Sequence, residues 1–362
     1  MTTVTTHPER GRNSRAGKIR VLVVDDSVVV RHLLRQALGQ DPDIEVVGAE
    51  ANGVDALARI PGLKPDLVTL DIEMPQMDGI QTLREIRKLY PRLRTIMFST
   101  LTTRGGSATF EALSLGADDY VAKSSSAGVL EQSLASLRAE LIPKIKQFFA
   151  ISGSGPSKPT SAVSAPTRSS IANPRIVAIG VSTGGPQALA VLVPMLPADF
   201  PLPILIVQHM PATFTRMLAE RLNAAGRLRV EEAGDAMEIL PGRILIGPGD
   251  YHLRVRNAGV SIRTVLDHGA QENSCRPSVD VLFRSVSEVY RGDVVSVMLT
   301  GMGSDGLRGT KALKTAGAYV LVQDEASSVV WGMPGAVAQA GLADNIVPLN
   351  RIAAELMRLT GR

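Results

Sequence analysis

The sequence predicts two α/β domains joined by a linker, and three observations carry that prediction. The chain has 362 residues, which suits two domains at roughly 100–200 residues each. Short apolar runs alternate with amphipathic segments of helical length in both halves of the chain, as in parallel sheets covered by helices. Between these patterns, 14 of the 20 residues from 151 to 170 are Ser, Gly, Pro or Thr. That composition is typical of a flexible linker.

The domain boundaries follow from these patterns. We expect a disordered tail over residues 1–17, a first domain over 18–147, a linker over 148–173 and a second domain over 174–362. Both domains should be built around mostly parallel sheets, since strand and helix signals alternate along them.

The composition also excludes some classes of protein. The single cysteine, Cys275, excludes an internal disulfide and suits a reducing compartment. No apolar run approaches the roughly 18 residues that a membrane span needs, and the polar N-terminus lacks the apolar core of a signal peptide. We therefore expect a cytoplasmic protein that is not membrane-embedded. The net charge of +4 is mild, so a solvated basic tail is favoured over one that binds nucleic acid or anionic lipid.

The first domain should contain five strand–helix units. Apolar runs predict strands at 19–24, 44–49, 67–70, 95–98 and 119–121. Amphipathic segments predict helices at 28–38, 53–60, 80–89 and 108–115, with a longer helix after the fifth strand.

The second domain repeats this alternation with one irregular stretch. Strands of buried type are predicted at 176–180, 204–208, 244–246, 294–299 and 319–322, and helices at 187–196 and 214–222. Residues 230–265 are less regular, and we interpret them as short antiparallel strands inserted into the α/β domain.

Polar residues gather where the strands of the first domain end, which is where doubly wound sheets bind ligands. The residues are Asp25, Asp26, Asp71, Ser99 and Lys123. Clustered carboxylates repel one another unless a cation is present, and Mg²⁺ prefers oxygen ligands. With Mg²⁺ bound, Asp71 can attack a phosphoryl donor, while Lys123 offsets phosphoryl charge and Ser99 donates a hydrogen bond. One acid could instead be a helix cap, but the full set is not explained in that way.

These residues and their spacing resemble the response-regulator receiver domain. The matching segments are Val23-Val24-Asp25-Asp26-Ser27, Pro65-Asp66-Leu67-Val68-Thr69-Leu70-Asp71-Ile72-Glu73-Met74-Pro75, Met77-Asp78-Gly79, Ser99 and Gly116-Ala117-Asp118-Asp119-Tyr120-Val121-Ala122-Lys123. The resemblance implies a flavodoxin-like (βα)5 fold and a chemotaxis-type histidine kinase as phosphoryl donor. It also implies that Asp71 is the phosphoacceptor and that Ser99 and Lys123 are the switch residues. The implied Mg²⁺ ligands are Asp25, Asp26, Asp71 and the backbone carbonyl of Glu73. The sequence departs from the family at Ser124, where proline usually follows the lysine.

The second domain carries a serine, a histidine and an aspartate just after three expected strands. Ser182 lies in a tight glycine-rich turn, His209 follows the second strand, and Asp305 lies in the loop after 294–299. Because parallel strand ends meet at one edge, these residues would supply a nucleophile, a base and a carboxylate that orients the base. Each residue alone has a structural alternative, such as capping a helix. The coincidence of all three favours hydrolysis.

The second domain contains two other patterns that can indicate a nucleophile. Gly180-x-Ser182-x-Gly184 fits the nucleophile elbow of α/β-hydrolases, but the order there is Ser, acid, His, whereas here it is Ser, His, Asp. That family is therefore the less favoured parent. Cys275 offers a thiol, but the sequence shows no partner base for it, and we interpret it as a bystander.

The second domain resembles the catalytic domain of the chemotaxis protein-glutamate methylesterases, the CheB family. The matching segments are Ile179-Gly180-Val181-Ser182-Thr183-Gly184-Gly185-Pro186, Val207-Gln208-His209-Met210-Pro211, Arg276-Pro277-Ser278-Val279-Asp280-Val281-Leu282-Phe283 and Met298-Leu299-Thr300-Gly301-Met302-Gly303-Ser304-Asp305-Gly306. The resemblance implies a mostly parallel, Rossmann-like esterase domain that needs no cofactor for its reaction. It implies hydrolysis of glutamate γ-methyl esters on methyl-accepting chemoreceptors, and deamidation of certain glutamines, through an acyl-serine.

The same resemblance implies further site residues. The backbone amides of Thr183 and Met302 would hold the oxyanion. Arg276 and Asp280 would lie near the cleft, with a structural helix start as the alternative interpretation.

A receiver in front of an esterase suggests control by phosphorylation. Our hypothesis is that the unphosphorylated first domain packs over the Ser182 cleft, and that phosphorylation of Asp71 releases it by changing local charge. Two alternatives remain open. The second domain could be a binding module, although residues 174–362 show no helix-turn-helix and we expect no nucleic-acid partner. It could also be a serine hydrolase that acts on another ester or amide.

Overall fold

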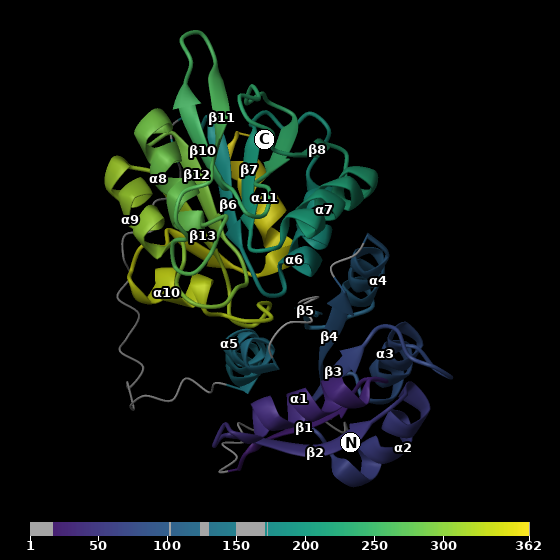
Figure 1. The fold of residues 1–362 in the computed structure, drawn as a ribbon. Helices are drawn as coiled ribbons and strands as arrows, with labels where there is room; N and C mark the ends of the chain where they lie inside the picture. Colours follow the sequence, from purple (N-terminus) through teal and green to yellow (C-terminus); the bar gives the residue numbers. More distant parts are fainter. Residues whose placement is uncertain (1–16, 101–102, 124–129, 150–170, 172, 362) are drawn as a thin grey trace, which may run out of the picture.

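The structure is a computed structural model that describes residues 17–100, 103–123, 130–149, 171 and 173–361. The chain forms two α/β domains, which lie one above the other in Figure 1. The fold class predicted from the sequence is therefore confirmed. The expected tail, most of the expected linker and Ser124 lie outside the described residues.

The N-terminal domain has a five-stranded parallel sheet with the strand order β2-β1-β3-β4-β5. This order is that of the flavodoxin-like folds. The strands are β1 (Ile19–Val24), β2 (Ile44–Glu50), β3 (Leu67–Asp71), β4 (Arg94–Thr100) and β5 (Asp119–Lys123). The helices are α1 (Val28–Gly39), α2 (Gly53–Leu63), α3 (Gly79–Leu89), α4 (Thr103–Ser114) and α5 (Leu130–Phe149).

The C-terminal domain has a seven-stranded parallel sheet with the order β14-β13-β12-β6-β7-β9-β8. Its strands are β6 (Ile176–Val181), β7 (Ile204–Gln208), β8 (Arg229–Glu232), β9 (Arg243–Ile246), β12 (Val294–Met298), β13 (Tyr319–Gln323) and β14 (Asn345–Val347). A separate antiparallel pair, β10 (His252–Asn257) and β11 (Ile262–Asp267), forms a hairpin that projects away from the N-terminal domain (Figure 1).

Helices cover the larger sheet on both faces, as its fully buried strands require. They are α6 (Gly185–Leu192), α7 (Ala212–Ala225), α8 (Val279–Tyr290), α9 (Leu307–Ala316), α10 (Met333–Gln339) and α11 (Leu349–Leu359), with a short 3₁₀ helix, η1 (Val193–Met195). Because all seven strands of this sheet run parallel, their carboxyl ends share one edge.

The prediction of antiparallel strands over residues 230–265 is half wrong. β8 and β9 join the main sheet as parallel strands, and only β10 and β11 are antiparallel. Four-residue strands give too short an apolar run to reveal the direction of their partners, so the sequence pattern could not separate the two cases.

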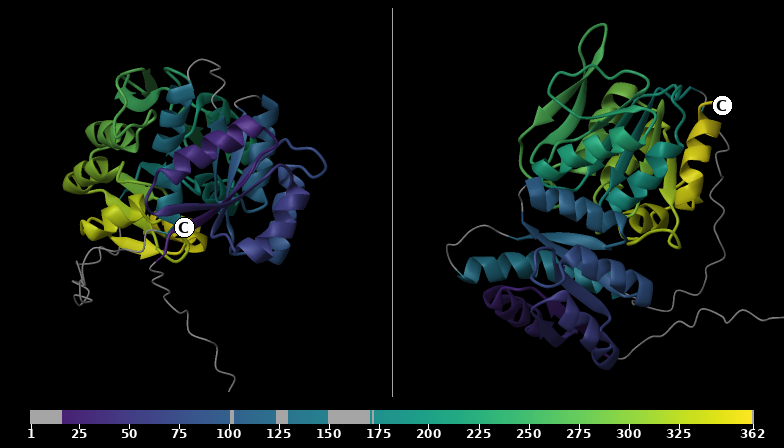
Figure 2. Two further views of the ribbon diagram at one scale, coloured as in Figure 1. Left: turned by 60° about the horizontal axis from the view of Figure 1, so that its bottom comes forward. Right: turned by 90° about the vertical axis from the view of Figure 1, so that its right-hand side faces the viewer.

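One apolar core extends through both domains. The buried Phe110 and Tyr120 of the N-terminal domain pack in the same cluster as Phe214 of α7. The right-hand view of Figure 2 shows α4 and β5 directly beneath the C-terminal domain. The two domains are thus in direct contact in this structure.

Candidate active site

Three neighbouring strands bring the serine, the histidine and the aspartate to one edge of the larger sheet. β6 lies between β12 and β7, and all three run parallel. Ser182 directly follows β6, His209 directly follows β7, and Asp305 lies in the loop after β12. The sheet order reverses at β6, and this is the position where doubly wound sheets place their ligands.

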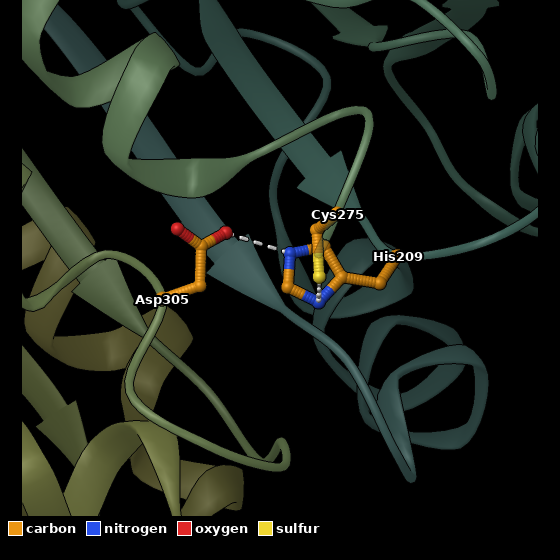
Figure 3. Close-up of side chains that lie close together, drawn as sticks. All are labelled: His209, Cys275 and Asp305. Atoms are coloured by element: carbon orange, nitrogen blue, oxygen red, sulfur yellow. Dashed lines mark hydrogen bonds and ion pairs between the residues drawn. The ribbon is translucent and has the colours of Figure 1, made fainter. Parts of the chain in front are cut away.

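The three side chains form a continuous hydrogen-bonded chain. Ser182 Oγ lies 3.1 Å from His209 Nδ1, and His209 Nε2 lies 2.8 Å from Asp305 Oδ2. Figure 3 shows the imidazole directed at the carboxylate. The sequence could not have indicated which ring nitrogen faces which partner.

Asp305 is held by the N-terminus of α8. Its carboxylate accepts hydrogen bonds from the backbone N–H groups of Val279 at 2.6 Å and Asp280 at 3.2 Å, and from the Ser278 hydroxyl at 2.8 Å. The side-chain amide of Asn273 adds a fourth bond at 2.7 Å. The free N–H groups and the dipole of a helix start favour an anion, so this shell fixes both the charge and the orientation of Asp305.

The histidine and the aspartate shift each other's pKa. Burial lowers the pKa of His209, but its hydrogen bonds to Asp305 and Cys275 outweigh burial and raise the pKa above its ordinary value. Burial raises the pKa of Asp305, but His209, Ser278 and Val279 hold it well below its ordinary range. Asp305 is therefore a carboxylate at neutral pH, suited to stabilise an imidazolium.

A cavity of about 360 Å³ opens onto these side chains. Thr183, Gly184, Asn273, Met302 and Ser304 line it beside the serine, histidine and aspartate. The backbone N–H groups of Thr183 and Met302 donate to no acceptor among the described residues. They are thus free to donate to an oxygen atom of a ligand in the cavity.

Cys275 lies against the imidazole of His209. Its sulfur is 3.6 Å from Nδ1, and in Figure 3, where the ring is seen nearly face-on, the sulfur lies over the ring. His209, Cys275 and Asp305 offer metal-ligand atoms within 4.8 Å of one another. However, Asp305 and Ser182 already engage the two ring nitrogens. The arrangement is better suited to proton transfer than to holding a metal.

Arg276 and Asp280, which were expected near the cleft, have structural contacts. Arg276 pairs with Asp250 at 2.5 Å and donates to the Gly269 carbonyl at 2.7 Å. Asp280 is buried and accepts from the backbone N–H of Gly309 at 2.6 Å. Neither residue lines the cavity.

The acidic cluster of the N-terminal domain also comes together. The Lys123 ammonium lies 2.7 Å from Asp71 Oδ2 and 2.9 Å from Asp25 Oδ2. Burial and the charge of Asp25 raise the pKa of Asp71 to about 6, against the opposing effect of Lys123. Oxygen atoms of Asp25, Asp26 and Asp71 lie within 4.8 Å of one another, and Asp26 is exposed. Three carboxylates at this spacing fit a hard divalent cation.

The two remaining residues predicted for this cluster lie nearby. Ser99 is buried, and its hydroxyl donates to the Gly105 carbonyl at 3.0 Å. Glu73 and Asp26 line a cavity of about 660 Å³ at the same sheet edge. The cavity is also lined by Ile72, which directly follows Asp71, the last residue of β3.

The N-terminal domain contributes to the wall of the active-site cavity. Asp119, Tyr120, Leu113, Glu140 and Lys144 line it from the opposite side. The hydroxyl of Thr183, next to Ser182, donates to Asp119 at 3.1 Å. The serine cleft is therefore covered by β5 and α5.

The contact between the domains is also apolar. The rings of Tyr120 and Phe214 stack with centroids 4.9 Å apart and planes inclined by 2°. The ammonium group of Lys144 lies 5.3 Å from the centroid of the same Tyr120 ring and 3.2 Å from the carboxylate of Asp119.

Comparisons with known proteins agree with this architecture. A sequence model described as CheB methylesterase matches residues 177–356, and one described as response regulator receiver domain matches residues 21–135. The chain is 49% identical over 350 residues to a protein-glutamate methylesterase/protein-glutamine glutaminase of Trichodesmium erythraeum (strain IMS101), covering 95% of this chain and 99% of the relative. The chain belongs to the CheB methylesterase family.

Other CheB relatives and one solved structure agree with this assignment. A protein of the same description from Nocardioides sp. (strain ATCC BAA-499 / JS614) is 47% identical over 352 residues, covering 95% of this chain and 96% of the relative. The crystal structure of the Thermotoga maritima CheB methylesterase catalytic domain is 41% identical, with a TM-score of 0.51, and covers 52% of this chain and 100% of that chain. Within the described residues, no helix combines the length and apolar character needed to cross a membrane.

Three residues of this CheB site were not singled out from the sequence. Asn273 and Ser278 bond to Asp305, and the side chain of Gln208 bonds to the backbone of Ser182. Ser278 and Gln208 lie inside segments that resemble the family, so the sequence around them could have indicated that they belong to the site. Asn273 lies in an irregular stretch, where no sequence pattern indicates a site residue.

Proposed function

We propose that this chain is a phosphorylation-controlled protein-glutamate methylesterase that hydrolyses glutamate γ-methyl esters on chemoreceptors and deamidates particular receptor glutamines. The observation that carries the proposal is the chain of hydrogen bonds from Ser182 through His209 to the buried Asp305, at the floor of a cavity. A module that only bound a partner would have no use for a carboxylate held so firmly behind a histidine.

The geometry supports acyl transfer through Ser182. His209 carries its proton on Nε2, donated to Asp305, which leaves the Nδ1 lone pair to accept the serine proton. The serine oxygen then attacks the ester carbonyl, and the imidazolium returns the proton to the leaving methoxide, which departs as methanol. Water, deprotonated by the same nitrogen, hydrolyses the acyl-serine and regenerates Ser182. With a glutamine substrate, ammonia is the leaving group.

The free backbone amides of Thr183 and Met302 support an oxyanion site. Both residues line the cavity next to Ser182. Donors that already point at the developing negative charge stabilise the tetrahedral intermediate, typically by about 2.7–4 kcal/mol for each donor.

The acidic cluster supports phosphorylation of Asp71 by a histidine kinase. We assign the Mg²⁺ ligands as Asp25, Asp26, Asp71 and the carbonyl of Glu73. When bound there, Mg²⁺ would neutralise phosphoryl charge and orient the donor. Lys123 and Ser99 are positioned to move toward the phosphoryl group, since both already lie at this sheet edge. The short strand β5 joins Lys123 directly to Asp119 and Tyr120 in the domain contact.

This connection supports release of the cleft by phosphorylation. The cover over Ser182 comes from the N-terminal domain, so a change in the position of β5 alters access to the serine. The function does not require a cofactor at Ser182.

The test is methanol release from membranes that contain methylated chemoreceptors. We expect the wild type to release methanol, and to release more when Mg²⁺ and a phosphoryl donor are present. Ser182→Ala should abolish release. Asp71→Ala, or chelation of Mg²⁺, should remove only the increase that the phosphoryl donor causes.

Circular dichroism and gel filtration would establish that each variant is folded. Methanol release by folded Ser182→Ala at the wild-type rate would refute the serine mechanism. Release from a different esterified protein, with none from receptor membranes, would place the chain among hydrolases of another substrate.

A further inference from the structure

Gln208 is the last residue of β7 and directly precedes His209, yet it has no part in the reaction scheme above. Its side chain is almost completely buried, with 2% of the residue exposed. Its amide nitrogen donates to the backbone carbonyl of Ser182 at 2.9 Å and to that of His209 at 3.3 Å. One side chain is thus bonded to the backbone of both the nucleophile and the base.

The Gln208 side chain makes these bonds just beyond the point where backbone pairing between β6 and β7 ends. The paired register of β6 and β7 ends at Val181 and Gln208, and the last backbone hydrogen bond between them runs from His209 N to Val181 O, at 3.3 Å. Beyond it, the carbonyls of Ser182 and His209 both face the same point. Two acceptors cannot bond to each other, and a primary amide with its two N–H groups satisfies both.

The local structure is shaped to hold this amide. Ser182 O also accepts from Gly185 N at 2.8 Å, which closes the turn that carries the serine. A Cβ atom at Gly185 would lie 1.8 Å from Gln208 Oε1, so a larger residue there would displace the glutamine amide. The oxygen Oε1 is buried and has no hydrogen-bond partner among the described residues.

An unpartnered buried amide oxygen lowers stability, so its retention calls for a functional explanation. We propose that Gln208 is a positioning residue, which fixes the Ser182 hydroxyl at hydrogen-bonding distance from His209 Nδ1. Gln208 also lines the cavity, but its role in this proposal is to set the separation of Ser182 and His209, which act on the substrate. This inference rests on the proposed function, because it assigns the role of Gln208 within that reaction.

The test varies the number of hydrogen-bond donors on the side chain of residue 208. Gln208→Met has similar length and no donor. Gln208→Glu donates one hydrogen bond when protonated and none when ionised, and burial raises the pKa of such a carboxyl. Ser296→Ala is a matched control, because Ser296 of β12 is buried, does not line the cavity, and donates a side-chain hydrogen bond to the backbone carbonyl of Tyr319.

The experiment measures methanol release by the full chain, with a phosphoryl donor and Mg²⁺, across a range of pH and receptor concentration. We expect kcat of Gln208→Met to fall by roughly 10–100-fold with KM little changed, as a small misplacement of reacting groups would cause. The ratio of Gln208→Glu activity to wild-type activity should be highest at low pH and should fall as the carboxyl ionises, whereas the ratio for Gln208→Met should show no such fall. Ser296→Ala should keep the wild-type kcat.

A second measurement, by NMR, reports the hydrogen bond between Ser182 and His209 independently of catalysis. The ¹⁵N signals of the His209 ring report the hydrogen bonds of both nitrogens, and Gln208→Met should shift the Nδ1 signal toward that of Ser182→Ala. Wild-type kcat in Gln208→Met, or an unchanged Nδ1 signal, would overturn the positioning role. If the wild type releases no methanol, the proposed function fails, and the ring signals still decide whether Gln208 positions the pair.

Discussion

At the scale of single residues, the charge of Asp305 controls the behaviour of His209. Five donors from the described residues converge on its carboxylate, including two amides from the start of α8. A carboxylate with so many donors stays ionised, and it favours the protonated imidazole beside it. In the proposed mechanism His209 must lose that proton before it can act as a base, so the contact that orients the ring would also set the pH range of the reaction.

Hydrolysis should therefore have its acidic limb above the pH expected for an ordinary histidine. Activity falls as pH drops, because protonated His209 cannot accept the serine proton, and the raised pKa moves this loss upward. In Asp305→Asn the main group that raises the pKa is gone while burial remains, so the limb should move to lower pH. The maximal rate should fall on the order of 10²–10⁴-fold.

The measurement is kcat/KM for methanol release over a range of pH, for the wild type and Asp305→Asn. Ser99→Ala, in the other domain, serves as a control whose acidic limb should stay with that of the wild type. An acidic limb that stays in place in Asp305→Asn would contradict the assignment of His209 as the titrating base.

At the scale of elements, β5 and α7 meet in the contact between the two domains, and β5 also covers the cleft. β5 has Lys123 at one end, in the acidic cluster, and Asp119 and Tyr120 at the other, against the C-terminal domain. Because the strand has only five residues, a displacement near Lys123 has a short path to the stacked ring of Phe214. Packed elements shift as units, so the strand is suited to couple the two sites.

Weakening this stack should raise the activity of the unphosphorylated protein. Phe214→Leu removes the aromatic pair with Tyr120, whose stacking contributes roughly 0.5–1.5 kcal/mol beyond buried area. If that free energy holds the domains together, the open fraction should rise by about two- to tenfold, because 1.4 kcal/mol corresponds to tenfold. Basal methanol release should rise in proportion.

Phe283→Leu is the matched control, since Phe283 of α8 is equally buried but belongs to a different apolar cluster, away from the domain contact. It should lower stability without raising basal release. An increase of the same size in both variants would show that loosening of the fold, rather than opening of the contact, is responsible.

At the scale of the whole molecule, the two domains share one apolar cluster but have separate sheets. A catalytic domain of the same family has been crystallised on its own, and its whole length matches this chain. Each sheet has its own covering helices, so the C-terminal domain has the means to fold independently.

Residues 174–362 alone should hydrolyse receptor esters faster than the unphosphorylated full chain. The cavity then loses the wall that Asp119, Tyr120 and Lys144 provide, and Ser182 becomes accessible. The comparison is methanol release at equal concentrations of the two proteins, with unfolding temperatures measured in parallel. Equal rates from two folded proteins would exclude inhibition by the N-terminal domain.

Much of this architecture could be predicted because its signals are local. Apolar runs of strand length and amphipathic segments of helix length lie along the chain, and they gave both sheets. Residues that directly follow parallel strands must share an edge, which placed Ser182 with His209 and Asp71 with Lys123. The strand expected at 244–246 is β9, but the antiparallel direction expected over 230–265 was wrong for β8 and β9, whose four-residue runs carry no information about the direction of their partners.

The sequence by itself determined the two α/β domains, the strand ends and the kinds of side chain that gather there, because each depends on periodicity and chain order. Tertiary structure alone decided which nitrogen of His209 faces Ser182, that the start of α8 holds Asp305, and that Gln208 joins the nucleophile to the base. It also decided that Tyr120 stacks on Phe214 across the contact between the domains. These contacts join residues far apart in the chain, and their distances depend on how whole elements pack, which no local pattern specifies.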